Sequence, residues 1–198
     1  LRKKTYMLAN PFEKDNNFLN TNPLKGHKSP KKIVTPASSE KMIREVENLR
    51  TLDCRLLQSK NYEVFFAKAK DIPNILHEIG RLREITFREV GEGTNESIDL
   101  DKYDQYYRHL FLWDDETNKI AGAYRMGLGC EIYPKYGMDG FYLNGLFRFE
   151  PELHEMLHKS IEMGRAFIIK EYQQKPMPLF LLWRGIIHTT LHYPEHKY

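Results

Sequence analysis

Cysteines and long apolar runs are both scarce in this sequence. Its 198 residues include only Cys54 and Cys130, which are too few for a disulfide framework and lack the spacing of a zinc motif. No run of roughly 18 apolar residues occurs, so we expect no transmembrane helix. Residues 1–4 lead into no apolar segment of the kind found in signal peptides, so we expect no secretory leader. These absences favour a reducing, cytoplasmic location.

The remaining composition is that of a folded protein. Hydrophobic residues make up 41% and charged residues 29% of the chain, a balance outside the range of disordered proteins. The length suits one domain, or one domain with a tail. We expect a basic linker or arm over residues 1–38 and a folded domain over residues 39–198.

Positive charge is concentrated at the N-terminal end. Residues 1–35 carry eight Lys or Arg and two acidic residues, a net +6, whereas the rest of the chain carries 22 basic and 25 acidic residues, a net −3. Such a segment is typical of a solvated linker. An alternative is a patch for an acidic protein or for anionic lipids, with peripheral contact at the inner membrane face. Because the folded part is acidic, we expect no nucleic-acid partner.

Periodicity predicts alternating helices and strands. Asp71 is expected to cap a helix that reaches about Val90, and residues 127–140 are expected to form a loop. The segments 109–113 and 120–126 are expected to form a hairpin. The pattern predicts an α/β or α+β fold with a mixed sheet flanked by helices. The other expected elements are strands at 62–68 and 160–169 and helices that begin near 38–39, at 151–158 and at 178–192.

Three polar clusters could carry chemistry. Arg81, Arg83, Glu84 and Arg88 lie on the predicted helix of residues 71–90, and Asp99, Asp101 and Asp104 lie in the loop after it. Glu162 and Arg165 share one strand, on which strict alternation would place them on opposite faces. A bulge near Gly164 would bring them to one side. Arg125 is a charge in an apolar strand, which requires a partner. A purely structural ion-pair network remains an alternative for these residues.

Other chemistries find weaker support. The acidic loop lacks the central Gly and terminal Glu of an EF-hand. His188 and His192 have helical spacing, but HExxH is absent. No GxSxG elbow occurs, and neither cysteine has an activating context. We therefore expect no metal and no cysteine nucleophile.

The charged segments together resemble a known family, the hemolysin-like N-acyltransferases, which include ornithine and glycine lipid synthases. This group is a branch of the GNAT-like fold related to the acyl-homoserine-lactone synthases. The resemblance covers about residues 60–198. Its motifs are REITFR (83–88), GEGT (91–94), DLDKYD (99–104), HLFLW (109–113), GAYR (122–125), EMGRAF (162–167) and LWRGI (182–186).

The resemblance implies site residues at matching positions. It implies a catalytic role for Glu162 and Arg165, with Glu162 as the general base that deprotonates the attacking amine. It implies substrate binding, or support of the binding groups, by Arg83, Phe87, Asp101, Asp104 and Arg125. Arginines would hold the acceptor carboxylate, and backbone N–H groups would stabilise the oxyanion.

The resemblance also implies donor, acceptor and partners. It implies transfer of a fatty acyl chain from acyl carrier protein to the amine of glycine or ornithine in aminolipid synthesis, without a cofactor. It implies an O-acyltransferase, fused or separate, as a functional partner. The alternatives are a membrane-associated hemolysin-like protein that transfers no acyl group, and an acetyl-CoA-dependent GNAT enzyme.

Two departures from the family pattern bear on these expectations. The segment Lys170–Pro176 (KEYQQKP) stands where acetyl-CoA enzymes carry a Q/R-x-x-G-x-G/A loop, and its lack of glycines disfavours acetyl-CoA as donor. The family fold also continues beyond residue 198, so we expect a domain that is incomplete at its C-terminus.

Overall fold

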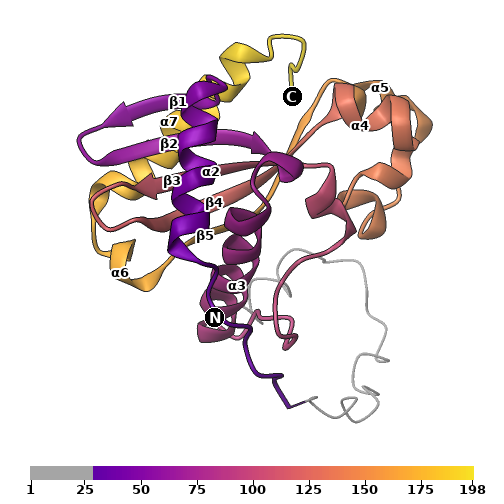
Figure 1. The fold of residues 1–198 in the computed structure, drawn as a ribbon. Coiled ribbons are helices and arrows are strands. Elements are labelled where there is room, and N and C mark those ends of the chain that lie inside the picture. The colour runs from indigo at the N-terminus through magenta and orange to yellow at the C-terminus, as the bar shows by residue number, and fades with distance from the viewer. Residues whose placement is uncertain (1–28) are drawn as a thin grey trace.

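The computed structural model describes residues 29–198. Five strands form a single sheet in the order β1-β2-β3-β4-β5, and every neighbouring pair is antiparallel (Figure 1). Helices cover both faces of this sheet. The strands are β1 (Arg55–Ser59), β2 (Tyr62–Lys68), β3 (Arg108–Asp114), β4 (Lys119–Leu128) and β5 (Ile161–Ile168).

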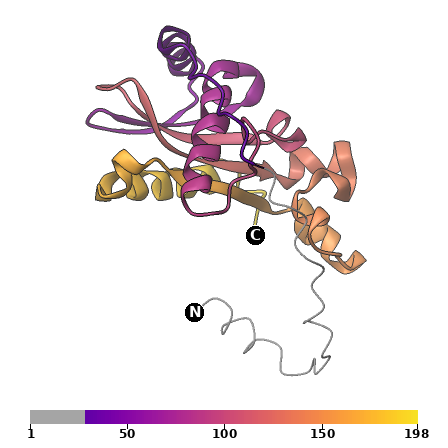
Figure 2. The ribbon, with the colours of Figure 1, turned by 90° about the horizontal axis from the view of Figure 1, so that it is seen from below.

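Helices α2 (Ser39–Thr51) and α3 (Pro73–Glu89) cover one face (Figure 2). Strand side chains alternate between the two faces of a sheet, so Phe65 and Ala67 of β2 point to this side together with Phe111 and Trp113 of β3. These side chains and the apolar stripes of both helices form one buried cluster. The period-two pattern of the strands thus builds the first half of the core.

Helix α7 (Pro176–His192) covers the opposite face. Leu181 and Leu182 of this helix pack on Val64, Leu110 and other side chains of the second core cluster. Gly185 permits this close approach, because a Cβ there would lie 2.7 Å from Val64 Cγ1. The backbone of α7 therefore lies directly on the sheet.

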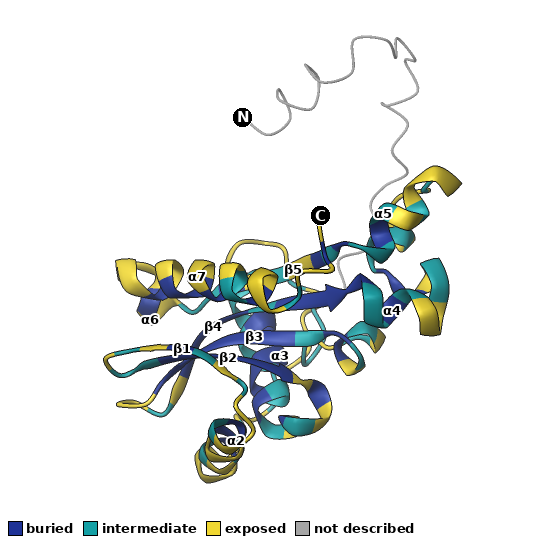
Figure 3. Ribbon diagram, turned by 90° about the horizontal axis from the view of Figure 1, so that it is seen from above, coloured by how far each residue is buried: buried dark blue, intermediate teal, exposed yellow. Residues whose placement is uncertain are grey.

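The outer side of α7 is apolar and exposed (Figure 3). Its large side chains are between 51% and 72% exposed; they are Leu179, Phe180, Trp183, Ile187 and Leu191. Ile186, close to these side chains on the helix surface, is half-buried. A second apolar side packs on the sheet.

Short helices extend one end of the sheet. They are α4 (Gly129–Tyr136), α5 (His154–His158) and several 3-10 turns, and they enclose a third cluster of Tyr107, Ile132, Phe141 and Leu157. The 3-10 turn η3 (Lys102–Gln105) leads directly into β3. This end of the sheet carries the candidate site.

The predicted fold class is confirmed, with corrections to several elements. The four long strands, the hairpin and the helices near 39, 73, 154 and 176 all occur. The sheet of the described residues is antiparallel rather than mixed. The sequence patterns did not indicate β1 or α6 (Lys170–Gln173), and α4 lies within residues 127–140, whose glycines and tyrosines predicted a loop.

The N-terminal cap of α3 also differs from the prediction. Asp71 lies in the preceding 3-10 turn, and Ile72 occupies the N-cap position without a side-chain cap. Glu45 of α2 supplies the missing acceptor, because its carboxylate accepts from the backbone N–H groups of Asn74 and Ile75, both at 2.8 Å. Tertiary contact between two helices therefore replaces the local cap.

The expected arm of residues 1–38 lies mostly outside the described residues. Residues 29–38 form neither helix nor strand, and they lie against the loop after α3. The N–H groups of Lys31 and Val34 donate to the carbonyls of Asn95 and Ser97, each at 3.0 Å. The boundary at residue 38 stays a prediction.

Strand β5 is the last strand of the described sheet. At its beginning, the N–H of Lys197 donates to the carbonyl of Lys159, and the N–H of Ile161 donates to the carbonyl of Tyr198. The N···O distance is 2.8 Å in both bonds. The chain thus returns, after α7, to the start of β5. Within residues 29–198, no helix has the length and apolar character needed to cross a bilayer.

Replacing Glu45 by Ala tests the shared cap. We expect the free energy of unfolding to fall by about 1–2 kcal/mol, the range found for the loss of a helix cap. Urea unfolding would measure the loss, with Glu89→Ala, an exposed position on α3, as the control. Equal stabilities of the two variants would contradict a capping role.

Candidate functional site

A buried arginine on α3 organises the candidate site. The guanidinium of Arg83 pairs with both oxygens of Asp104, at 3.1 and 2.9 Å, and also donates to the backbone carbonyl of Asp99. Its Nε lies 3.0 Å from Asp99 Oδ2, close enough for an ion pair although the angle is not that of a hydrogen bond. All three side chains are at most 3% exposed. Arg83 therefore fixes the segment after α3 against the helix.

A second buried arginine joins the same carboxylate from β4. Arg125 Nη1 donates to Asp101 at 2.7 Å and to Asp104 at 3.2 Å. Its guanidinium carbon lies 5.2–5.5 Å from the ring centres of Tyr103, Tyr107 and Tyr142, which is cation–π distance. Two carboxylates and three aromatic rings thus stabilise the buried positive charge of Arg125.

The acidic loop has a second role as a helix cap. Asp101 accepts from the N–H of Tyr103 at 2.8 Å, and Asp104 accepts from the N–H of Asp101 at 2.8 Å. This reciprocal capping box begins η3. The same carboxylates therefore order the turn and hold the arginines.

Burial and the arginines act in opposite directions on the carboxyl groups. Burial raises the pKa of Asp99 despite the charges of Arg83 and Arg165. Burial also opposes the ionised form of Asp104, but the hydrogen bonds and charge of Arg83, with the charge of Arg125, hold the pKa of Asp104 below its usual range. Asp104 is therefore the ionised partner that both buried arginines share.

His109 of β3 lies behind this cluster. Its Nε2 lies 2.9 Å from the backbone carbonyl of Asp104, and its Nδ1 has no hydrogen-bond partner. Burial lowers the pKa of His109 to about 4. A neutral imidazole thus supports the loop without adding charge to it.

Glu162 of β5 holds a neighbouring loop. Its oxygens accept from the hydroxyl of Tyr107 and from the backbone N–H groups of Tyr142 and Leu143, the latter two at 3.1 and 2.8 Å. Burial, followed by the bond to Glu162, raises the pKa of Tyr107, which keeps the hydroxyl a donor. Three donors occupy this carboxylate, so the geometry gives Glu162 a positioning role. Its expected catalytic role stays a prediction.

The bulge expected near Gly164 occurs. The register of β4 and β5 shifts between Ala123 and Arg125, and Arg165 has a φ of +51°. The bulge turns Arg165 to the side of Glu162, because its guanidinium lies 5.4 Å from the ring of Tyr142, whose N–H Glu162 accepts. A left-handed conformation in a non-glycine residue stores strain of the kind found at functional sites.

Arg165 differs from the two buried arginines in its bonding. Its Nε is 3.6 Å from Asp99 and its Nη2 is 4.0 Å from Asp101, both beyond hydrogen-bond distance. Its buried Nε has no hydrogen-bond partner. Among the described residues, no side chain accepts a hydrogen bond from the Nη groups of Arg165, whereas those of Arg83 and Arg125 donate to carboxylates.

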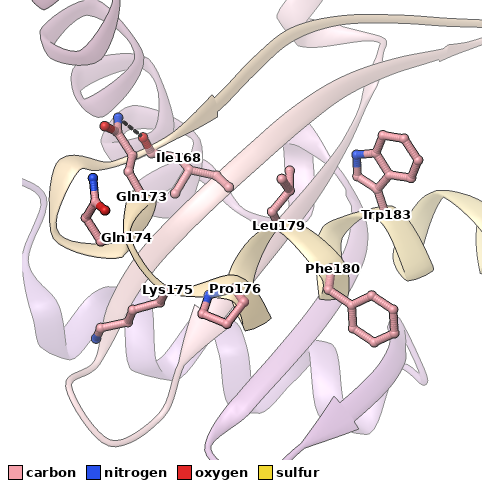
Figure 4. Close-up of a pocket in the computed structure, with 8 residues that line it drawn as sticks. All are labelled: Ile168, Gln173, Gln174, Lys175, Pro176, Leu179, Phe180 and Trp183. Carbon is pink, nitrogen blue, oxygen red and sulfur yellow. Dashed lines mark hydrogen bonds between the residues drawn. The ribbon is translucent and has the colours of Figure 1, made fainter.

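Three adjoining hollows lead away from Arg165. The first, of about 370 Å³, is lined by Phe87, Glu92, Arg165 and Ala166. The second, of about 330 Å³, shares Phe87, Glu92 and Ala166 with the first and continues to Ile168 and Leu179. The third, of about 740 Å³, is the apolar groove between Ile168 and α7 (Figure 4).

The structure brings most of the predicted residues together. Arg83, Asp101, Asp104 and Arg125 form one network, and Phe87 and Arg165 line the first hollow. The prediction missed His109, the tyrosines around Arg125 and Glu92 as a lining residue. The cluster of tyrosines at 103, 106 and 107 was the available signal for an aromatic surround.

One further group of possible metal ligands lies elsewhere. Cys130, Glu195 and His196 place ligand atoms within 4.8 Å of one another. Both ring nitrogens of His196 already have partners, since Nε2 accepts from the N–H of Cys130 at 3.4 Å and Nδ1 lies 3.3 Å from the Tyr193 carbonyl. Burial raises the pKa of the Cys130 thiol to about 11, which disfavours the thiolate that a metal requires. These contacts fit a structural role.

The arrangement of sheet, bulge and polar cluster agrees with a family match. Residues 82–183, just over half of the chain, match the model of the acetyltransferase (GNAT) domain, and the chain belongs to this family. It is similar to the glycine N(alpha)-acyltransferases of Bacteroides thetaiotaomicron and Phocaeicola vulgatus, at 34% identity over 177 residues in each case. The aligned part covers 84% of this chain and 52% and 54% of those proteins, so the chain spans about half their length. No solved structure gives a significant match.

The buried histidine predicts a pH dependence of stability. Between pH 6.5 and about 4 the unfolded chain binds a proton at His109 that the folded chain excludes, so stability falls as the pH drops through this window. The loss would reach about 3 kcal/mol by pH 4. His109→Gln keeps a donor for the Asp104 carbonyl and should flatten this slope in urea unfolding at several pH values. If stability depended on pH in the same way in this variant as in the wild type, the assignment of the pH dependence to His109 would be contradicted.

Proposed function

We propose that this protein is an N-acyltransferase that moves a fatty acyl chain from acyl carrier protein to the α-amine of glycine or ornithine. The names of the two relatives support glycine as the acceptor. The product would enter aminolipid synthesis, as the resemblance to the hemolysin-like N-acyltransferases and the acyl-homoserine-lactone synthases implies. An O-acyltransferase, fused or separate, would then complete the lipid.

One observation carries the proposal: Arg165 lines a small polar hollow that is connected, through the second hollow, to the apolar groove. A guanidinium with unused N–H groups fits the carboxylate of an amino acid, which it can bind through two parallel hydrogen bonds. In the groove, Leu179 and Trp183 lie on one side of α7 and Phe180 on the other (Figure 4). Such a lining fits a fatty acyl chain. Acceptor and donor would thus meet near Phe87 and Ala166.

The reaction needs a neutral amine and a polarised thioester. The amine nitrogen attacks the carbonyl carbon, the C–N bond forms, the C–S bond breaks, and the thiol leaves with a proton. Beyond Ile161, the outer edge of β5 has no strand partner in residues 29–198. Its N–H groups are candidates to stabilise the oxyanion.

The donor choice rests on the same groove. The loop Lys170–Pro176 forms α6 and one end of the groove, and it lacks the glycines that would let backbone N–H groups approach a pyrophosphate. This supports acyl carrier protein over acetyl-CoA. A carrier with acidic helices would dock on basic surface, and high salt would weaken that docking. The proposed location is cytoplasmic, with peripheral contact at the inner membrane face.

Arg165→Lys tests the acceptor site. A lysine cannot form the bidentate pair, so we expect the KM for glycine to rise roughly tenfold or more while the KM for acyl carrier protein changes little. The assay would follow N-acylglycine by mass spectrometry. Arg184→Lys is the matched control, because Arg184 is exposed on α7 and its guanidinium lies over the ring of Phe180 rather than in the hollow that Arg165 lines. An unchanged KM for glycine would remove Arg165 from the acceptor site. Absence of any acyl transfer by the wild-type protein would contradict the proposed function.

Glu162→Gln separates the two roles of that residue. The amide would place a donor against backbone N–H donors, so we expect a loss of about 1–3 kcal/mol in unfolding free energy. We also expect a lower kcat, because the loop at Tyr142 shifts, with an unchanged shape of the pH–rate profile. Unchanged stability with loss of the acidic limb of the pH–rate profile would assign Glu162 as the general base instead.

A further inference from the structure

We propose that the aromatic ring of Tyr142 positions the Arg165 guanidinium for the carboxylate of the acceptor amino acid. This inference rests on the proposed function and deepens it, because it adds a residue of the segment between α4 and α5 to the acceptor site. Tyr142 is a positioning residue in this proposal, since it acts on the substrate through Arg165. The ring carries the effect, and the hydroxyl group takes no part in it.

The guanidinium of Arg165 lies near two carboxylates without a hydrogen bond to either one. Its distances to Asp99 and Asp101 are 3.6 and 4.0 Å, and the side chain is 26% exposed. A long side chain of this kind loses conformational entropy when it adopts a single orientation. Binding a carboxylate through two parallel N–H groups requires such an orientation. A contact that selects it beforehand therefore strengthens binding.

The ring of Tyr142 supplies a contact of this kind. Its centre lies 5.4 Å from the guanidinium carbon of Arg165 and 5.2 Å from that of Arg125. Both distances are within the range of cation–π attraction. Arg125 is itself fixed by hydrogen bonds to Asp101 and Asp104. The ring is thus anchored on a rigid cation and is available to hold a less restrained one.

Contacts of the ring and of the backbone fix Tyr142 itself. The rings of Tyr103 and Tyr142 have centres 5.5 Å apart and planes at 81°, the edge-to-face arrangement. The backbone N–H of Tyr142 donates to the Tyr107 hydroxyl at 3.0 Å and to Glu162 at 3.1 Å. Glu162 and Arg165 both lie on β5. One strand therefore carries the acceptor that holds the loop and the arginine that the ring contacts.

The hydroxyl group of Tyr142 distinguishes this residue from its neighbours. The hydroxyls of Tyr106 and Tyr107 donate to the Gly140 carbonyl at 3.0 and 3.2 Å. Among residues 29–198, the Tyr142 hydroxyl has no hydrogen-bond partner. Tyr142→Phe would therefore keep every contact that the proposal uses, whereas Tyr142→Leu would keep apolar volume and remove the cation–π contacts.

The first test measures the KM for glycine in the acyl-transfer assay of the full chain. With Tyr142→Leu we expect it to rise about fivefold, the size of one cation–π contact, while the KM for acyl carrier protein changes little. Tyr142→Phe should restore the wild-type value. Tyr133→Leu is the matched control, because Tyr133 is a half-buried ring of the third core cluster that stacks on His158. It has no cation–π contact with a described arginine.

The second test follows the Arg165 Nε–H signal in proton–nitrogen NMR spectra of the full chain and needs no acyl donor. An aromatic ring near an N–H group displaces its proton signal. Tyr142→Leu should therefore move the signal, whereas Tyr142→Phe should leave it close to its wild-type position. A merely structural role of Tyr142 would not produce this difference between the two variants.

Each outcome decides the proposal. A wild-type KM for glycine in Tyr142→Leu, with or without a moved signal, would overturn the positioning role and leave the proposed function standing. Equal losses in Tyr142→Leu and Tyr142→Phe would also overturn it, since the hydroxyl would then carry the effect. An equal rise in Tyr133→Leu would do the same, because loss of any ring would then suffice. Absence of acyl transfer by the wild type would instead contradict the proposed function, and the positioning role with it.

Discussion

The pairing of Arg83 with Asp104 is the constraint on which the site depends. A buried guanidinium is tolerated only with a well-formed partner, and loss of one partner of such a pair typically costs about 3–5 kcal/mol. Here Asp104 also serves Arg125 and caps η3. One carboxylate therefore connects α3, the 3-10 turn and β4, so that the helix, the turn and the sheet reach their positions together.

This network also separates supporting residues from ligand-facing ones. Arg83 and Arg125 are at most 2% exposed and use their N–H groups on protein acceptors. Arg165 lies in a bulge with a left-handed backbone, and its distances to Asp99 and Asp101 exceed those of hydrogen bonds. We infer that the buried pair of arginines makes the surroundings rigid, and that Arg165 contacts the substrate. Rigid support of this kind is what positions reacting groups within reach of one another.

Sequence reasoning predicted what depends on local pattern and missed what depends on distant contacts. The strand at residues 62–68 and the need of Arg125 for a partner are both visible in the sequence, and both are confirmed. The cap of α3 is not visible in the sequence, because its acceptor, Glu45, lies on another helix. The partners of Glu162 are backbone N–H groups of a loop, which no residue type reveals.

Helix α7 shows how one sequence pattern can serve two surfaces. A helix that is apolar on more than one side is usually buried all round, yet α7 buries Leu181 and Leu182 and exposes Leu179 and Trp183. The exposed side forms the wall of the groove that adjoins the acceptor hollow. Leu179, Phe180 and Trp183 give this wall the apolar surface that a fatty acyl chain requires, whereas the polar side chains Gln173, Gln174 and Lys175 line one end of the groove. The second apolar side of α7, which has no packing role among the described residues, is therefore best explained by the acyl donor in the proposed reaction.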